Sequence, residues 1–390
     1  MTIRHLAEKI VKTLAKAGYK AYFAGGWVRD FVMGHPSEDI DIATSAPPDV
    51  IQSLFSKTIP VGISFGVVIV LQDGHPFEVS TFRKDIGYTD GRRPDAIELA
   101  TPSEDALRRD FTINGMFYDP QDGLVLDYVG GKEDIEKKIV RTIGDPHARF
   151  QEDRLRMIRA VRFAVRFGFE IEENTRRGIC AFSRVLYPAV AVERVWQEWK
   201  KMCEHAGIGR AVKLLLELDL FYHMFPELKE SIAELPKSPK YPPILYIAIL
   251  YPNATLQKLL LFCQTYKLSN KDKEWVERYF EAKNLRGDLV GLVKFLVDPL
   301  VNPYGQLCLE AAGYSNEMIQ EMKQKLAPHI TRLQEHNPLV TSQDLMDEGI
   351  EPGIEMGKLL KEAEALAINR DLSSKQEVLG ALKESGIWPK

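Results

Sequence analysis

Strand patterning is confined to the first third of this chain, and that confinement limits its fold more than any other feature of the sequence. Short apolar and β-branched runs, some strictly alternating, occur up to about residue 128. Beyond about Asp145 the apolar residues recur at helical spacing, and this pattern continues to the last residues. The sequence therefore predicts an α+β chain, with a mixed α/β sheet at the N-terminus and an all-helical remainder.

The strand-rich region has recognisable elements. A helix is predicted over 1–19, followed by a strand at 21–24 that ends in a Gly-Gly turn. Residues 38–43 alternate acidic and apolar side chains, which is typical of a strand with one polar face. Residues 67–71 and 77–82 flank Asp73-Gly74 and predict a hairpin. By contrast, the polar, aperiodic stretch from Arg83 to Pro94 predicts a mobile loop.

Length and composition exclude several classes of protein. A chain of 390 residues is too long for one ordinary core and predicts two to four domains. Its four cysteines are widely separated, so we expect reduced thiols and neither a zinc site nor a disulfide framework. The N-terminus lacks the apolar block of a signal peptide, and no apolar stretch reaches bilayer-spanning length. We expect a cytoplasmic protein with no membrane association.

The net charge of −4 argues against a nucleic-acid-binding protein when it is considered alone. Phosphate contacts depend on local charge, however, and one segment is rich in arginine. The members of this basic segment are Arg141, Arg149, Arg154, Arg156, Arg159, Arg162 and Arg166. We predict that they form a basic stripe, so the overall charge does not exclude an RNA substrate.

Asp39 and Asp41 form the most suggestive acidic pair. Residues two apart on a strand point to the same face, so the two carboxylates would project together, about 7 Å apart along the chain. Hard oxygen ligands of this kind suit Mg²⁺, which binds through one or two carboxylates and substrate phosphates. Glu78, on a later predicted strand, is a third candidate, either as a ligand or as a general base. Exposed strand acids with no metal remain the alternative for all three.

A glycine turn precedes these acids. The glycines of Gly25-Gly26-Trp27-Val28-Arg29-Asp30 allow backbone N–H groups to approach phosphates at the start of a helix. Arg29 adds a fixed charge that could face a triphosphate. Farther along, Arg109, Asp110 and Asn114 lie within a short segment and could bind the sugar and phosphates of a nucleotide. A surface ion-pair cluster is the alternative for this second segment.

Residues 152–163 predict a helix with acidic and basic side chains along one ridge. Asp153, Arg156 and Arg159 are spaced by three, and apolar residues lie on another side. A carboxylate accepts from an exocyclic amine and a guanidinium donates to a ring nitrogen or carbonyl, so such a pair can recognise a base edge. Cytosine and adenine both carry an amine beside an acceptor nitrogen. The pair would therefore suit CTP and ATP, unless the segment is only a basic amphipathic helix that packs on its neighbour.

In combination, GGWVRD, EDIDIAT, RRDFTING and EDRLRMIRAVRF resemble the class II tRNA nucleotidyltransferases and bacterial poly(A) polymerases. The resemblance is tight over about residues 20–170 and looser beyond. It implies a nucleotidyltransferase head over 1–145, a helical neck with the nucleotide-selecting helix over 146–215, a body over 216–330, and a tRNA-binding tail over 331–390. It also implies that the 83–94 loop helps the terminal adenosine step.

The resemblance implies roles for particular residues. Asp39 and Asp41 would hold two Mg²⁺ ions, with Glu78 as a further catalytic acid. The nucleotide would be bound by Gly25, Gly26, Arg29, Arg109, Asp110 and Asn114, and selected by Glu152, Asp153, Arg156, Arg159 and Arg162. The reaction would be in-line attack of a tRNA 3′-hydroxyl on the α-phosphate of CTP or ATP. The expected partners are the tRNA acceptor end and these nucleotides, and no protein partner is implied.

Three rival functions remain open from the sequence. An A-adding enzyme that acts only on tRNA ending in CC would share the head and the loop. A poly(A) polymerase is less favoured, because this chain lacks an extended basic C-terminal tail. A non-catalytic RNA-binding protein could keep the fold, but the intact aspartates and arginines favour an enzyme.

Overall fold

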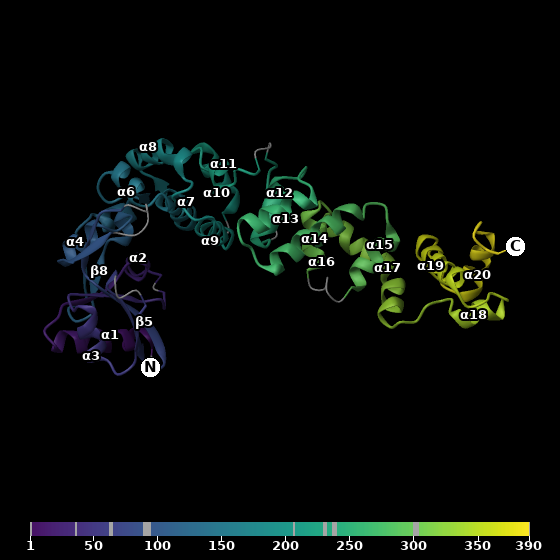
Figure 1. Ribbon diagram of the computed structural model, residues 1–390, viewed down its shortest axis with the longest axis horizontal. Coiled ribbons are helices and arrows are strands. Elements are labelled where there is room, and N and C mark those ends of the chain that lie inside the picture. Colours follow the sequence, from purple (N-terminus) through teal and green to yellow (C-terminus); the bar gives the residue numbers. More distant parts are fainter. Residues whose placement is uncertain are drawn as a thin grey trace. The chain divides into compact units, whose positions relative to one another are not determined.

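The structure is a computed structural model that describes residues 2–35, 37–61, 65–88, 95–205, 207–228, 232–235, 240–298 and 304–389. Two compact units make up the chain, Met1–Lys229 and Glu230–Lys390. The first contains the sheet and the helices that follow it, and the second is helical (Figure 1). The predicted α+β architecture is confirmed, while the finer division into head, neck, body and tail remains a prediction.

A mixed sheet forms the N-terminal part of the first unit. Within the described residues it has seven strands in the order β3-β4-β5-β2-β1-β8-β9. The central pair β2 and β5 is parallel, and the other neighbours are antiparallel. The strands are β1 (Ala21–Ala24), β2 (Asp41–Thr44), β3 (Thr58–Ile59), β4 (Val67–Gln72), β5 (His75–Thr81), β8 (Phe117–Asp119) and β9 (Leu124–Leu126).

Alternating burial gives this sheet two apolar faces. One face packs against α1 (Ile3–Lys16) and α3 (Pro48–Leu54), and its core includes Ile10 and Phe23. Ala43 and Phe117 lie in a smaller cluster that includes Ala106 of α4 (Pro102–Leu107). Asp41 is the first residue of the central strand β2 and lies opposite Ala24, the last residue of β1. Asp41 is therefore held at one end of the strands.

Two strand predictions need correction. The strand predicted over 38–43 begins only at Asp41, because its partner β1 ends opposite Asp41 and leaves the preceding residues without a ladder. The predicted loop also starts as a strand, since β6 (Arg83–Ile86) pairs with β7 (Ala96–Leu99). Gly87 and Tyr88 follow this strand, and residues 89–94 of the predicted loop lie outside the described residues. The hairpin was predicted correctly, with Asp73 and Gly74 both at positive φ.

Helices complete the first unit, and the 3-10 helix η2 (Thr112–Asn114) packs against α5 (Gly131–Glu136). Small strands β10 (Ile139–Val140) and β11 (Glu170–Ile171) form a parallel pair beside them. The helices are α2 (Gly26–Val32) near the sheet, then α6 (Pro146–Glu152), α7 (Leu155–Phe167), α8 (Glu173–Phe182), α9 (Val192–Cys203), α10 (Ile208–Glu217) and α11 (Phe221–Met224). Helix α7 packs against both α9 and α10.

The second unit is built from helices α12 to α20. Their bounds are α12 (Pro243–Leu250), α13 (Leu256–Thr265), α14 (Asn270–Asn284), α15 (Leu289–Val297), α16 (Gly305–Ala311), α17 (Asn316–Gln334), α18 (Ser342–Asp347), α19 (Ile354–Asn369) and α20 (Lys375–Glu384). The last three share a core of their own that includes Leu345, Leu359 and Leu382. No helix in the described part of the chain is long and apolar enough to cross a membrane.

Candidate active site

Predicted residues from distant parts of the first unit meet around one cavity of about 390 Å³. Its walls come from the start of β2, from the turn before α2 and α2 itself, from the segment after α4, and from α7, α9 and the residue before α7. The lining residues are Gly25, Gly26, Arg29, Asp41, Arg108, Arg109, Asp110, Asn114, Asp153, Arg156, Arg159, Phe163 and Arg194. Asp39, Glu78, Glu152 and Arg162 were also predicted as site residues, but they do not line this cavity.

The glycine turn keeps one wall of the cavity open. Gly25 has φ +66°, a conformation that L side chains rarely adopt. A Cβ atom on Gly25 would lie 3.7 Å from Asp41 Oδ2 and 3.5 Å from Arg109 Nη1. A side chain here would therefore fill the space between these two opposite charges. Helix α2 begins directly after the turn, so its free N–H groups lie at the same wall.

The acids beside β2 are close enough to repel one another. Although Asp41 is reached by solvent, its surroundings raise the pKa of its carboxyl to about 7. Loss of hydration is the main cause, followed by the charges of Glu78 and Asp39, and Arg109 acts in the opposite direction. A carboxylate in such a field is stabilised by a cation.

These acids fit a divalent cation only together with other ligands. Within the described ranges, no group of three or more His, Cys, Asp or Glu side chains could hold a metal ion. Mg²⁺ commonly uses one or two protein carboxylates and takes its remaining ligands from phosphates and water. Asp39, just before β2, and Asp41, the first residue of β2, match that donor set. The residues therefore fit a metal that arrives with a triphosphate.

Arg29 is held rigidly in the floor of the cavity. Its guanidinium donates to Asp30 Oδ1 at 2.8 Å and to Asn114 Oδ1 at 2.6 Å, and its side chain is only 4% exposed. The same group stacks over Phe167, 4.5 Å from the ring centroid. Burial lowers the pKa of Arg29, and Asp30 opposes that change. Asn114 Nδ2 in turn donates to Asp110.

Asp110 connects the sheet end of the cavity to α7. Its Oδ2 accepts from Arg159 Nη2 at 2.5 Å and from Arg159 Nε at 2.9 Å. Burial alone would raise the pKa of this carboxyl, but the charge and hydrogen bonds of Arg159 outweigh it and lower the pKa to about 2. Asp110 is therefore a fixed anion that orients Arg159 and Asn114.

Asp105 holds the two arginines that follow α4. Its side chain is 1% exposed and accepts from Arg108 Nε at 2.9 Å and from Arg109 Nη2 at 2.9 Å. It also accepts from the backbone N–H of Arg83, at the start of β6. The Arg109 guanidinium lies over the ring of Phe117, 4.8 Å from its centroid. Asp105 was not predicted, although its spacing of three and four from two arginines is a recognisable local signal.

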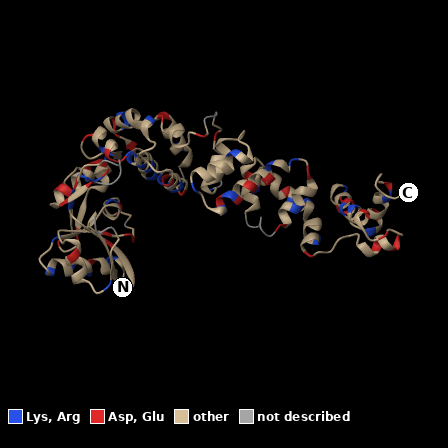
Figure 2. Cartoon of the chain, in the orientation of Figure 1, with Lys and Arg blue, Asp and Glu red and all other residues tan. Residues whose placement is uncertain are grey.

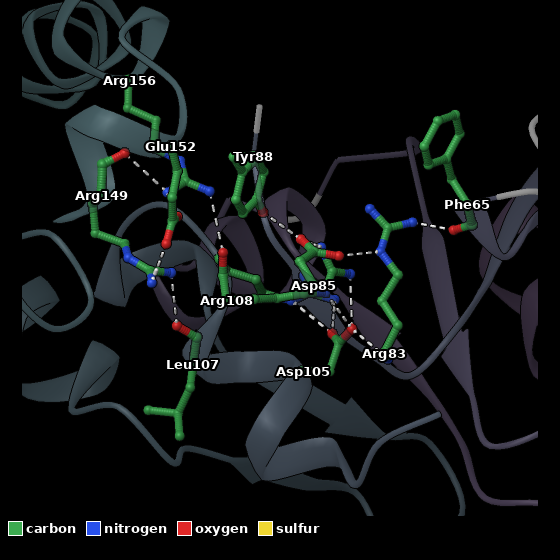
Figure 3. A network of polar contacts seen from close by, with 11 residues as sticks. Phe65, Arg83, Asp85, Tyr88, Asp105, Leu107, Arg108, Arg149, Glu152 and Arg156 are labelled. Carbon is green, nitrogen blue, oxygen red and sulfur yellow. Dashed lines mark hydrogen bonds and ion pairs between the residues drawn. The ribbon is translucent and has the colours of Figure 1, made fainter. Parts of the chain in front are cut away.

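A second network joins the strand β6 to helix α6 (Figure 3). Tyr88 donates its hydroxyl to Asp85 Oδ2 at 2.6 Å, and Glu152 accepts from both Arg149 and Arg156. Arg156 also donates to the carbonyl oxygen of Arg108. Glu152 lines a neighbouring cavity of about 280 Å³ and not the main one. Its ion pair with Arg156 positions that arginine, which does line the main cavity.

Asp153 does not lie on the helix that the sequence predicted. Helix α6 ends at Glu152, and Asp153 is extended, with φ −148° and ψ 103°. The carboxylate accepts from the backbone N–H of Leu155 at 3.0 Å, which favours a new helix start at this point over continuation. Asp153 thus precedes α7, and the predicted ridge of Asp153, Arg156 and Arg159 on one helix is wrong. All three nevertheless line the cavity.

Helix α9 supplies two residues that sequence reasoning missed. Arg194 donates to both oxygens of Asp153, at 2.7 and 3.2 Å. One turn later, Glu198 is 3% exposed and accepts from Arg162 Nε at 2.5 Å. Burial lowers the pKa of Arg162, whereas Glu198 raises it. Arg194 and Glu198 have helical spacing, but nothing in the sequence shows which helix they contact.

The prediction that the arginines of residues 141–166 form a basic stripe is therefore wrong, because acidic partners compensate most of their charges. Most of its arginines are paired with acids of the same unit. The pairs are Arg141 with Asp134, Arg149 and Arg156 with Glu152, Arg159 with Asp110, Arg162 with Glu198, and Arg166 with Asp30. Acidic and basic residues are accordingly mixed along these helices (Figure 2). The segment forms one wall of a cavity and is not a uniformly basic face.

Two family models match the first unit. One is described as "Poly A polymerase head domain" and matches residues 21–141. The other is described as "Probable RNA and SrmB- binding site of polymerase A" and matches residues 168–232. The first covers the sheet and the segment that supplies Arg109, Asp110 and Asn114. The second begins just after α7.

Similar proteins extend over nearly the whole chain. A CCA-adding enzyme of Bacillus cytotoxicus is 33% identical over 397 residues, which cover 98% of each protein. A solved structure of the Bacillus stearothermophilus CCA-adding enzyme in complex with CTP is 26% identical, with a TM-score of 0.70 over 98% of each chain. A Thermotoga maritima CCA-adding enzyme complexed with tRNA has the same fold, at 20% identity and a TM-score of 0.69, over 98% of this chain and 95% of that one. This chain belongs to the family of the CCA-adding enzymes, which are tRNA nucleotidyltransferases.

Proposed function

We propose that this chain builds the CCA end of tRNA, adding CMP and AMP to the 3′ terminus without a nucleic-acid template. The observation that carries the proposal is the single cavity in which Asp41 and Arg109 face Asp153 and Arg159. Acids for metal-assisted transfer and paired groups for base recognition meet there. Similar proteins described as complexes with tRNA, with ATP and with CTP support the same substrates. We also propose a cytoplasmic location, where the protein would meet a tRNA substrate.

Enzymes of this family generally need divalent metal ions, and we assign that role to Asp39 and Asp41 with two Mg²⁺ ions. The metals would activate the attacking hydroxyl and neutralise charge on the triphosphate. Glu78 would raise the negative potential at Asp41 and so strengthen cation binding. Its place on the strand next to β2 and its effect on the pKa of Asp41 support that role.

The remaining predicted residues would bind and orient the nucleotide. The N–H groups near Gly25 and Gly26 would face the phosphates, and Arg109 would add a positive charge beside them. Arg29, Asp110 and Asn114 form one hydrogen-bonded unit, which supports a role in fixing the sugar. Catalysis would then depend on positioning and charge neutralisation, because these groups are held in place before substrate arrives.

Base selection is assigned to the α7 side of the cavity. Ionised Asp153 is an acceptor and would take an amine hydrogen of cytosine or adenine, which uracil and guanine do not offer at that position. Arg156 would donate to the same base edge. Glu152, Arg159 and Arg162 would hold these groups in place through the ion pairs described above.

The test uses three tRNA transcripts that end at the discriminator base, at CC and at CCA. Each is incubated with the protein, Mg²⁺, and CTP, ATP or both, and the products are resolved at single-nucleotide length. We expect the shortest transcript to gain CCA and then stop. Addition of A to the CC transcript alone would identify an A-adding enzyme, and long A tails a poly(A) polymerase. No incorporation by the folded protein would contradict an enzymatic function.

A further inference from the structure

Arg194 of α9 lies in the cavity but has no role in the assignments above. Its side chain is 22% exposed, and two of its nitrogen atoms contact Asp153, Nη2 to Oδ2 at 2.7 Å and Nη1 to Oδ1 at 3.2 Å. A two-point contact of this kind fixes the plane of the carboxylate as well as its position. Arg194 therefore controls the direction in which Asp153 presents its oxygen atoms.

The hydrogen bonds of Asp153 leave little freedom for a base. An ionised carboxylate has about four acceptor sites, two on each oxygen. Among the described residues, Oδ1 accepts from the backbone N–H of Leu155 and from Arg194, and Oδ2 accepts from Arg194 alone. Three sites are therefore used, and the remaining one is on Oδ2. A base that meets this carboxylate finds a single acceptor in a fixed direction.

We propose that Arg194 is a specificity-determining positioning residue, which leaves Asp153 one acceptor site that fits the exocyclic amine of cytosine or adenine. The proposal rests on the proposed function, because it assumes that Asp153 contacts the base. Uracil and guanine present a carbonyl oxygen where the other two bases carry an amine, and a fixed acceptor repels it. Both also carry a ring N–H, so a carboxylate that can turn would accept from that group.

A second ion pair between α9 and α7 supports the contact between Arg194 and Asp153. Glu198, one turn after Arg194 on the same helix, pairs with Arg162 of α7. One ion pair joins α9 to Asp153, just before α7, and the other joins it to Arg162 within α7, so two contacts fix Arg194 relative to Asp153. Arg194 therefore acts through Asp153 and needs no contact with substrate.

The test compares single-turnover rates of addition for CTP, ATP, UTP and GTP in the unmodified protein and in Arg194→Met. We expect the CTP-to-UTP and ATP-to-GTP rate ratios to fall about tenfold, the scale of one lost base-reading contact. Arg194→Lys keeps the charge with one nitrogen atom and should recover part of the ratio. Arg176→Met, which removes an ion pair with Glu217 outside the cavity, is the matched control.

The outcomes separate this inference from the function on which it rests. Equal slowing of all four nucleotides, with unchanged ratios, would overturn the role of Arg194 while CCA addition by the unmodified protein still stood. If Arg194→Met does not fold, unchanged ratios in Arg194→Lys would overturn it equally well. Absence of CCA addition by the unmodified protein would instead contradict the proposed function.

Discussion

The acids at and beside β2 and the arginines of α7 differ in how their charges are compensated, in the two regions that meet at Asp41, Arg156 and Arg159 around the cavity. Among the residues that the structure describes, Asp39, Asp41 and Glu78 form no ion pair within 4 Å, and the charges of Glu78 and Asp39 contribute to the raised pKa of Asp41. The arginines of α7 are each paired, Arg156 with Glu152, Arg159 with Asp110 and Arg162 with Glu198. The difference fits the proposed function, in which the acids would take their counter-charge from bound cations, whereas the α7 side is already paired within the protein.

Asp41→Asn tests the acidic side and has the largest expected effect. The rate of nucleotide addition should fall on the order of 10³-fold, because the proposed metal ligand at the reacting phosphate is lost. Thermal stability should stay equal or rise, since the substitution removes a carboxylate that its neighbours repel. Rates from single-turnover extension and midpoints from thermal unfolding check both statements. Full activity in a folded protein would refute the metal assignment.

Glu198→Gln tests the α7 side, where stability should fall instead. The change leaves Arg162, whose side chain is 7% exposed, without its charged partner. Breaking a buried pair costs about 3 kcal/mol in the free energy of unfolding. Urea denaturation measures the loss. Arg177→Ala is the control, because its pair with Glu173 is exposed and should change stability by less than about 0.5 kcal/mol. Equal effects of the two substitutions would contradict a preorganised α7 side.

Acid should weaken the link between Asp110 and Arg159. The folded-state pKa of Asp110 is lowered to about 2, below the ordinary value of 3.8, so the folded protein binds this proton less readily than the unfolded chain. Its stabilisation, about 2 kcal/mol, is therefore present above pH 4 and is lost as pH falls toward 2.

Asp110→Asn provides the measurement for that acid dependence. The variant should be less stable at pH 7 and should lose less stability between pH 4 and pH 2 than the unmodified protein does. Urea midpoints across this range give the comparison. Identical acid dependence in both proteins would show that Asp110 does not carry the effect.

Local patterns predicted the parts of the fold that depend on neighbouring residues. The Asp73-Gly74 hairpin and the strand Ala21–Ala24 before Gly25 were both predicted correctly, because turn residues and short apolar runs can be recognised within a few neighbouring positions. Strand pairing with a partner that is distant in the sequence was not predicted. The strand Arg83–Ile86 depends on Ala96–Leu99, which no short window contains.

The candidate site shows the same division. Asp41, Arg109 and Asp153 were predicted from motifs, and all three line the cavity. The break before α7 was missed because helical spacing continues through it, although Asp153 bonds the N–H of Leu155. Arg194 was missed because its partner lies 41 residues away and on another element. Residue types were readable from the sequence, while their partners required the structure.

One experiment tests the division of labour between the two sides of the cavity most directly. Single-turnover addition of CTP, ATP, UTP and GTP is measured for the unmodified protein, Asp41→Asn and Asp153→Ala. We expect Asp41→Asn to slow CTP and ATP alike, and Asp153→Ala to reduce discrimination against UTP and GTP about tenfold or more. An Asp153→Ala protein that keeps full discrimination, or an Asp41→Asn protein with near-normal rates, would contradict the account.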